Sequence, residues 1–244
     1  MFEVKDLSAG YGGRAVIRNI KFSLREGDIL VLLGANGSGK STLIKVISGI
    51  LKPFSGTVTL NNIDLLSLKP IDRAKMIAVL PQFLSFDFPF SVEEIVTMGC
   101  YPYGMEKEEK VRWALERLEL NNLRYRKITS LSGGEFKRVV IAKVLVQASK
   151  LLLLDEPTSY LDLKHQLLLL DILRELSKNG LIIICVLHDI NMASTIASSV
   201  MLLKDGVSLA FGPPDKILTP DYLEKTFQVK SLRCDRCGRL SFSY

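Results

Sequence analysis

Hydrophobic residues follow two different patterns in the first fifty positions of the chain. Residues 15–24 alternate in part between apolar and polar side chains, after glycines at positions 10, 12 and 13. This alternation predicts antiparallel strands joined by a glycine-rich turn. Ile29–Leu33 is instead a continuous apolar run, which is typical of a strand covered on both faces. A glycine loop and a short helix, from about Ser41 to Gly49, are predicted to follow it.

A helical period and further apolar runs appear in the rest of the chain. From Val111 onward, apolar residues recur at i, i+3, i+4 and i+7, which predicts an inserted helical subdomain. Two continuous apolar runs, residues 151–154 and 181–187, enclose a helical pattern over about 163–178. Such a strand–helix–strand unit predicts a parallel sheet, and Asp205-Gly206 predicts a hairpin turn after it.

These elements fit one α/β domain over residues 1–244. Its core, with a mostly parallel sheet and an N-terminal antiparallel β subdomain, is expected from about 1–82 and 150–230. The helical subdomain is expected over about 83–149, and residues 231–244 form a C-terminal tail. The length agrees with this organisation, since roughly 150 residues per domain gives between one and two domains.

Composition narrows the class of protein. An apolar fraction of 48% with 24% charged residues describes a chain that buries a sizeable core, which excludes disordered and low-complexity architectures. The net charge of +6 would suit nucleic acid, an anionic membrane or a polyphosphate ligand, but the charges are dispersed and select none of them. No signal peptide is visible, and no apolar run approaches the ~18 residues that span a bilayer. Any membrane role is therefore expected to be peripheral.

The four cysteines are too few and too unevenly spaced for a disulfide scaffold, which favours a reducing compartment. Cys234 and Cys237 form a lone C-x-x-C in the tail. A zinc site shared across a dimer and a redox pair are two alternatives for this motif. The preferred interpretation is a terminal hairpin that turns near residues 235–238.

A phosphate-binding loop is predicted after the first buried strand. Residues 34–41 read Gly-Ala-Asn-Gly-Ser-Gly-Lys-Ser and fit G-x-x-x-x-G-K-[ST] between a strand and a helix, the context that the motif requires. Glycines let successive backbone N–H groups approach a polyphosphate, Lys40 adds a positive charge at the β and γ phosphates, and the Ser41 hydroxyl can ligate Mg²⁺. The residues expected to bind nucleotide here are Gly34, Asn36, Gly37, Ser38, Gly39, Lys40, Ser41 and Thr42.

Two adjacent carboxylates follow the apolar run 151–154. Ligands of open α/β sheets bind at the carboxyl ends of the strands, so Asp155 and Glu156 are expected at the same site. Asp155 can hold Mg²⁺, through water. Glu156 can orient and deprotonate the water that attacks the γ-phosphate.

Residues 131–135, Leu-Ser-Gly-Gly-Glu, precede an apolar-rich helix that is predicted to begin near Phe136. Such a helix start presents N–H groups and a positive dipole end to an anion, although a capping serine with a flexible glycine pair would also explain it. In combination with the phosphate loop and the Asp-Glu pair, the segment resembles the signature of the ATP-binding-cassette (ABC) ATPases. The resemblance covers nearly the whole chain and implies a P-loop NTPase (RecA-like) core.

Further residues take roles by this resemblance. Gln82 follows the strand Ile77–Leu80 and falls in the Q-loop, and residues 159–162 match the D-loop, which Asp162 ends. His188 matches the switch histidine that bonds the γ-phosphate, whereas without the family pattern it would be a core or capping residue. The catalytic residues implied are Glu156, His188, Gln82, Lys40, Ser132, Gly134 and Asp162, and the implied metal residues are Ser41, Gln82 and Asp155.

Tyr11 is placed like the aromatic residue that stacks on adenine in the family, with an ordinary turn tyrosine as the alternative. The second histidine, His165, lies on the amphipathic helix after the D-loop and is expected to face solvent. After the signature, Lys137 and Arg138 stand near the position of a Gln-Arg pair in the family, and Lys143 replaces an arginine. These substitutions keep charge or polarity and put only fine geometry in doubt.

The resemblance also implies partners. In the family, ATP with Mg²⁺ is sandwiched between the phosphate loop of one subunit and the signature of the other, so a second copy of the chain is expected to pair with this one head to tail. Other expected partners are transmembrane permease subunits and, indirectly, a substrate-binding protein, at the cytoplasmic face of the cell membrane. No nucleic-acid partner is expected.

Residues 88–96 follow the Q-loop, where family members contact a coupling helix of the permease. With the segments around Asp162 and His188, they are similar to the ATPases of iron-siderophore, haem and vitamin B12 importers, which favours uptake of a metal chelate. The alternatives are an importer of molybdate or another metal, an exporter, and a nucleic-acid- or ribosome-associated ABC ATPase. The aromatic residues of this region, Phe83, Phe86, Phe88 and Phe90, could simply be core.

Overall fold

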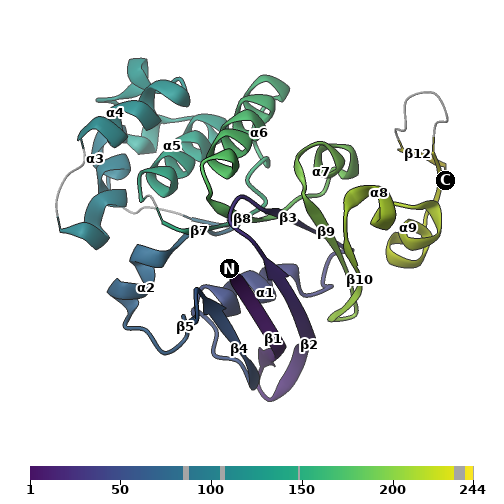
Figure 1. Ribbon diagram of the computed structural model, residues 1–244. Helices are drawn as coiled ribbons and strands as arrows, with labels where there is room; N and C mark the ends of the chain where they lie inside the picture. The colour runs from purple at the N-terminus through teal and green to yellow at the C-terminus, as the bar shows by residue number, and fades with distance from the viewer. Residues whose placement is uncertain (85–87, 105–107, 148, 234–239, 244) are drawn as a thin grey trace.

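A six-stranded sheet forms the centre of the computed structural model, which describes residues 1–84, 88–104, 108–147, 149–233 and 240–243 (Figure 1). The strand order is β10-β9-β3-β8-β7-β6, and all pairs are parallel except β9 with β10. The strands are β3 Ile29–Leu33, β6 Ile77–Leu80, β7 Leu151–Asp155, β8 Ile182–Val186, β9 Ser199–Lys204 and β10 Val207–Gly212. The predicted parallel sheet, and the hairpin at Asp205-Gly206, are confirmed.

β3 shows why its sequence is apolar at every position. Leu30 and Leu32 point into one hydrophobic cluster, with Leu43 of the helix α1 (Lys40–Ile47). Val31 and Leu33 belong to a second cluster on the opposite face, with the helices α5 (Gly133–Val146) and α6 (Leu163–Lys178). Because alternate strand residues point to opposite faces, a strand between two cores has no polar position.

An antiparallel sheet packs against α1 from the other side, with strand order β2-β1-β4-β5 (Figure 1). Its strands are β1 Phe2–Tyr11, β2 Arg14–Leu24, β4 Ser55–Leu60 and β5 Ile63–Asp64, and α2 (Pro70–Met76) leads from it to β6. Phe2 and Leu7 share the hydrophobic cluster of Leu43. The helix α1, which begins at the phosphate loop, is thus held between the two sheets.

Helices fill most of the segment between β6 and β7. They are α3 Val92–Thr97, η1 Met98–Tyr103, α4 Glu108–Arg117, η2 Asn121–Leu123, η3 Ile128–Ser130 and α5. The sequence placed the start of α5 near Phe136, and this boundary is wrong by three residues. The Ser132 hydroxyl accepts a hydrogen bond from the Glu135 N–H, and the Glu135 carboxylate accepts one from the Ser132 N–H. This capping box stabilises a helix that begins at Gly133.

The chain ends in the helices α7 Ile190–Ile196, α8 Pro214–Ile217 and α9 Pro220–Phe227, followed by the antiparallel pair β11 Lys230–Arg233 and β12 Leu240–Ser243. The two strands of the predicted terminal hairpin are therefore present. The turn at 235–238 and both tail cysteines lie outside the described residues. In the described part of the chain, no helix combines the length and the apolar character that crossing a bilayer requires.

Candidate active site

The loop between β3 and α1 has a backbone that depends on glycine at two positions. Gly34 has φ of 155°, and a Cβ atom there would lie 2.2 Å from the carbonyl oxygen of Leu203. Gly39 has φ of 103°, and its Cβ would lie 2.6 Å from Cγ2 of Ile17. A side chain at either position would have to displace the neighbouring strand or side chain, so the loop can close this tightly only with glycine.

Lys40 is held inside the curve of this loop. Its Nζ donates to the carbonyl oxygens of Gly34, at 2.7 Å, and Ala35, at 2.9 Å. Burial lowers the pKa of the Lys40 ammonium, and the carboxylates of Glu156 and Asp155 oppose that shift. Ser38, also buried, has a hydroxyl with no hydrogen-bond partner among the described residues. Lys40 thus presents a cation to the cavity of the loop, as a phosphate group requires, and the buried Ser38 hydroxyl of the same loop is left without a partner among the described residues.

Asp155 ends β7 with its side chain buried. Burial raises the pKa of this carboxyl; a hydrogen bond from Ser41 opposes the shift. Oδ1 of Asp155 has no hydrogen-bond partner in the described part of the structure. An unpaired buried carboxylate oxygen beside a hydroxyl is a donor set that Mg²⁺ accepts, because hard cations prefer oxygen ligands. The residues present therefore fit the metal that the sequence predicted here.

Glu156 has a left-handed backbone, with φ of 51°, a strained conformation that is found preferentially at functional sites. Its Oε1 accepts a hydrogen bond of 3.0 Å from Nε2 of Gln82, at the end of β6, and lies 2.8 Å from Nε2 of His188, beyond β8. Three neighbouring parallel strands thus bring these residues together at one sheet edge. The resemblance implied a role at the nucleotide for all three residues, and in the structure their side chains are in contact.

A cavity of about 420 Å³ is lined both by the phosphate loop and by the residues at the carboxyl edge of the sheet. Its lining residues are Val16, Asn36, Gly37, Gly39, Lys40, Ser41, Thr42, Gln82, Glu156 and His188. Val16 is the one lining residue that sequence reasoning missed. Tyr11 does not line the cavity: its half-exposed ring lies 5.9 Å from Nζ of Lys45, and its stacking on adenine stays a prediction.

The remaining predicted residues lie elsewhere. Ser132 caps α5 and Gly134 lies in its first turn. Asp162 caps α6, where its side chain accepts a hydrogen bond from the His165 N–H at 2.9 Å. None of them lines the cavity. A Cβ atom on Gly134 would lie 2.9 Å from the carbonyl oxygen of Tyr160, so the signature and the D-loop of one chain are in contact. In the described chain, the cavity is built without the signature.

Two other expectations are tested by burial. Phe83 and Phe88 are strongly exposed and Phe90 packs partly against the core, while Phe86 lies outside the described residues. The prediction that His165 faces solvent is wrong, because its side chain is only 17% exposed and lies against Asp162 and Glu119.

Lys137 is buried, which the sequence did not indicate because lysine is ordinarily a surface residue. Burial lowers the pKa of its ammonium, and the carboxylates of Glu156 and Asp155 oppose the shift. A second cation of the same chain therefore acts on the two carboxylates from the side of the signature helix.

The arrangement described above defines a P-loop nucleoside triphosphatase. Its parts are a glycine loop with a buried lysine, an Asp oxygen without a hydrogen-bond partner among the described residues, and a glutamate held by Gln82 and His188, all at the carboxyl edge of a parallel sheet.

A family model for ABC transporters matches residues 17–159. The hemin import ATP-binding protein HmuV of Rhodopseudomonas palustris (strain HaA2) is 38% identical over 246 residues, covering 97% of this chain and 94% of the relative. The iron(3+)-hydroxamate import ATP-binding protein FhuC of Bacillus subtilis (strain 168) is 38% identical over 233 residues, covering 92% and 87%.

Two solved structures agree with these relatives. A chain from an inward-facing transporter assigned to the metal-chelate type superposes with a TM-score of 0.81 at 31% identity, covering 99% of this chain and 96% of the other. A dimeric ATP-binding cassette in a post-hydrolysis state, bound to ADP and Pi, gives 0.79 at 27% identity, covering 88% and 99%. The chain belongs to the ABC transporter family and has the fold of its ATP-hydrolysing subunits.

Proposed function

We propose that this chain energises the import of a metal chelate, of the iron-siderophore, haem or cobalamin type, through separate membrane subunits. The observation that carries the proposal is the pair of relatives named for hemin and for iron(3+)-hydroxamate import, each 38% identical over more than nine-tenths of this chain. Both named substrates are iron chelates. The chelate is expected to contact other subunits, so the proposal extends to the chemical class and not to one compound.

For ATP hydrolysis, we assign the general base to Glu156. Gln82 and His188 both contact its Oε1, and no described residue donates a hydrogen bond to Oε2. Oε2 is therefore the oxygen that can take a proton from the attacking water, while the two contacts on Oε1 fix the orientation of the carboxylate. Lys40 and the N–H groups of the loop hold the β and γ phosphates.

Mg²⁺ would be held by the Ser41 hydroxyl and by Asp155, through water. Gln82 uses its amide nitrogen on Glu156, so its amide oxygen remains available as a third ligand. When bound, the metal neutralises charge on the phosphate oxygens.

A second copy of the chain would supply Ser132 and Gly134 to the nucleotide. This part of the proposal is supported by the position of both residues away from the cavity that holds Lys40, and by the likeness to a dimeric cassette. Closing on ATP and parting after hydrolysis would then give a two-state motion that can drive a membrane partner.

The permease is proposed to dock in a groove of about 1050 Å³ on the helical subdomain, which would place the chain peripherally at the cytoplasmic membrane face. The groove residues are Phe90, Glu93, Glu94, Thr97, Met98, Cys100, Tyr101, Gly104 and Lys143. Tyr101 is 78% exposed at its rim. A large apolar residue left exposed beside a hollow is typical of a surface that another protein covers.

The test is co-purification with the permease subunits, followed by uptake in vesicles loaded with ATP and Mg²⁺. An iron-siderophore complex, hemin, cobalamin and molybdate are offered separately. Uptake of one of the chelates is expected, and uptake of molybdate alone would overturn the chelate assignment.

Tyr101→Arg should reduce co-purification with the permease while basal ATP hydrolysis persists. Phe54→Arg, a change at an equally aromatic exposed site before β4, is the matched control.

A further inference from the structure

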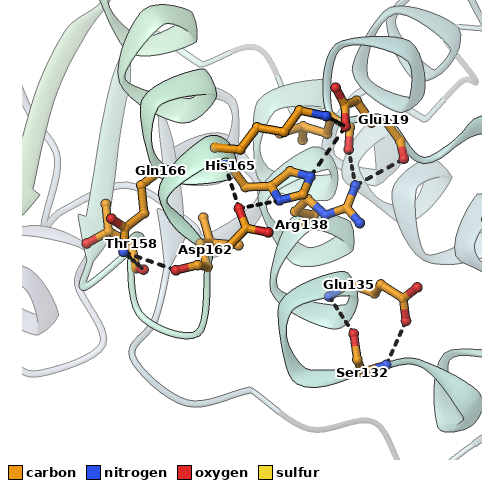
Figure 2. Close-up of polar contacts among 11 residues, drawn as sticks. Glu119, Ser132, Glu135, Arg138, Thr158, Asp162, His165 and Gln166 are labelled. Atoms are coloured by element: carbon orange, nitrogen blue, oxygen red, sulfur yellow. Dashed lines mark hydrogen bonds and ion pairs between the residues drawn. The ribbon is translucent and has the colours of Figure 1, made fainter.

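His165 lies between two carboxylates that belong to different parts of the fold (Figure 2). Its Nδ1 is 2.8 Å from Oδ1 of Asp162, the last residue of the D-loop, and its Nε2 is 3.4 Å from Oε2 of Glu119, beyond the end of α4. An ionised carboxylate only accepts hydrogen bonds, so Nδ1 carries the hydrogen of the bond to Asp162. Nε2 is buried and faces the Glu119 carboxylate, so this second contact is an ion pair that requires a hydrogen on Nε2 as well.

Glu119 is in turn fixed to the signature helix. Nη1 of Arg138, on α5, donates to the carbonyl oxygens of Leu118, at 2.7 Å, and Glu119, at 3.0 Å (Figure 2). Arg138 is buried, and Glu119 has a left-handed backbone with φ of 53°. A buried guanidinium that bonds two successive carbonyl groups holds this turn against α5.

The D-loop is also attached to α5 and α6 at other points. The carbonyl oxygen of Tyr160 lies so close to Gly134 that a Cβ there would be 2.9 Å away. Nε2 of Gln166 donates to the carbonyl oxygens of Thr158, at 3.2 Å, and Leu161, at 3.0 Å. The D-loop thus touches the first turn of the signature helix at Tyr160, and at Asp162 it is linked to the same helix through His165 and Glu119.

We propose that His165 is a positioning residue that couples the D-loop to the signature helix through Asp162 and Glu119. The inference rests on the proposed ATP-dependent pairing, in which the signature serves the nucleotide of the opposite subunit and carries the adjoining D-loop with it. With the bridge in place, the two segments reach the partner's ATP as one unit. Without it, the D-loop can shift relative to the signature, and hydrolysis slows although nucleotide binding in the cavity of Lys40 is unchanged.

Substitutions separate the two contacts of the ring. Asn places its amide near the position of Nδ1, so His165→Asn can keep the contact with Asp162 but cannot reach Glu119. His165→Ala removes both contacts, and Glu119→Ala removes only the far one. Lys164→Ala is the control, because Nζ of Lys164 is the other partner of Oε2 of Glu119, at 2.6 Å, and lies outside the bridge.

The measurements are kcat and KM for ATP, ATP-dependent pairing and the thermal midpoint of each variant. We expect His165→Ala, His165→Asn and Glu119→Ala to lower kcat by about fivefold or more, the lower end of typical coupling between sites, with KM within about twofold. The double variant His165→Ala/Glu119→Ala should be no slower than either single one, because both remove the same link. Lys164→Ala should stay near the wild type.

The inference is overturned if the wild-type chain pairs and hydrolyses ATP while His165→Ala keeps its kcat. It is also overturned if Glu119→Ala is normal, or if the defects of the double variant multiply, because His165 would then act only on its own helix. A wild-type chain that fails to pair on ATP would instead count against the proposed function. If His165→Ala does not fold, His165→Asn and Glu119→Ala carry the same test.

Discussion

Nε2 of His188 lies 2.8 Å from Oε1 of Glu156, and the same oxygen accepts the amide hydrogen of Gln82 at 3.0 Å. Two side chains therefore contact the same carboxylate oxygen of Glu156. They follow β6 and β8, the strands on either side of β7. This arrangement keeps Glu156 in a fixed orientation at the strained backbone turn after β7. The glutamate is accordingly the residue whose removal is most informative about hydrolysis.

Glu156→Gln should lower kcat by about 10²- to 10⁴-fold, the range for the loss of a general base, because an amide cannot take the proton of the attacking water. ATP binding should persist, since Lys40 and the loop are untouched, and the paired form should accumulate. Steady-state hydrolysis and size-exclusion chromatography with ATP measure the two effects. Turnover close to that of the wild type would remove Glu156 from this role.

Lys40→Ala should act on binding itself. The ammonium is buried within the phosphate loop, and its loss removes the point charge for the β and γ phosphates. We expect the affinity for a non-hydrolysable ATP analogue to fall by about tenfold or more, as for a lost charged hydrogen bond of about 1.5 to 3 kcal/mol. Calorimetric titration measures it, with the exposed Lys52→Ala as the control. Unchanged affinity would contradict the loop geometry.

Asp155→Asn should stabilise the nucleotide-free protein and abolish its response to Mg²⁺ with ATP. Burial raises the pKa of Asp155, so the folded state binds more protons than the unfolded state between the ordinary pKa of 3.8 and the raised pKa. Stability is therefore lost as pH rises through that window, and the loss is complete once the pH exceeds the raised pKa. Asparagine carries no charge and avoids it.

The thermal midpoint of Asp155→Asn at neutral pH should rise by about 2 to 4 °C, the shift that about 1 kcal/mol gives in a protein of this size. The advantage should shrink as the pH falls and vanish below 3.8, because wild-type Asp155 is then protonated in both states. Scanning calorimetry with and without Mg²⁺ and ATP tests both statements. An equal or lower midpoint at neutral pH would mean that the buried carboxylate is better solvated than its surroundings indicate.

Ser132→Arg should damage the nucleotide site of the opposite subunit. Mixed dimers test this with Lys40→Ala as the second change. With the two substitutions on different subunits, one site keeps both its loop and its signature, and about half of the activity should remain. With both on one subunit, each site loses one part and activity should nearly vanish. Equal rates for the two arrangements would be incompatible with a shared site.

The sequence specified the elements that carry the strongest patterns. Ile29–Leu33 is apolar at every position because each face of that strand meets a different core, and Leu163–Lys178 forms the helix that its periodicity predicts. The start of α5 was misplaced because glycine lowers helix propensity, whereas the capping box of Ser132 and Glu135 outweighs it. The start of this helix is therefore set by hydrogen bonds between Ser132 and Glu135, which the spacing of apolar residues does not reveal.

Some residues of the site are predictable from the sequence, and others are placed only by packing. The loop, Asp155 and Glu156 are short motifs with a fixed spacing, so one stretch of chain is enough to predict them. The environment of His165 depends on Glu119, which is remote in sequence and reaches it only through the packing of α4 against α5. The burial of Lys137 likewise follows from the packing of α5 against β6, which the sequence around Lys137 does not encode.

The two hydrogen bonds from Lys40 to the carbonyl oxygens of Gly34 and Ala35 have a consequence for the kinetics of nucleotide capture. These hydrogen bonds order the loop before any ligand arrives. The conformational entropy of the loop is therefore lost during folding and not when nucleotide binds. Incoming phosphate needs only to draw the ammonium away from two oxygens. Association should accordingly be governed by diffusion and charge, with no slow rearrangement preceding it.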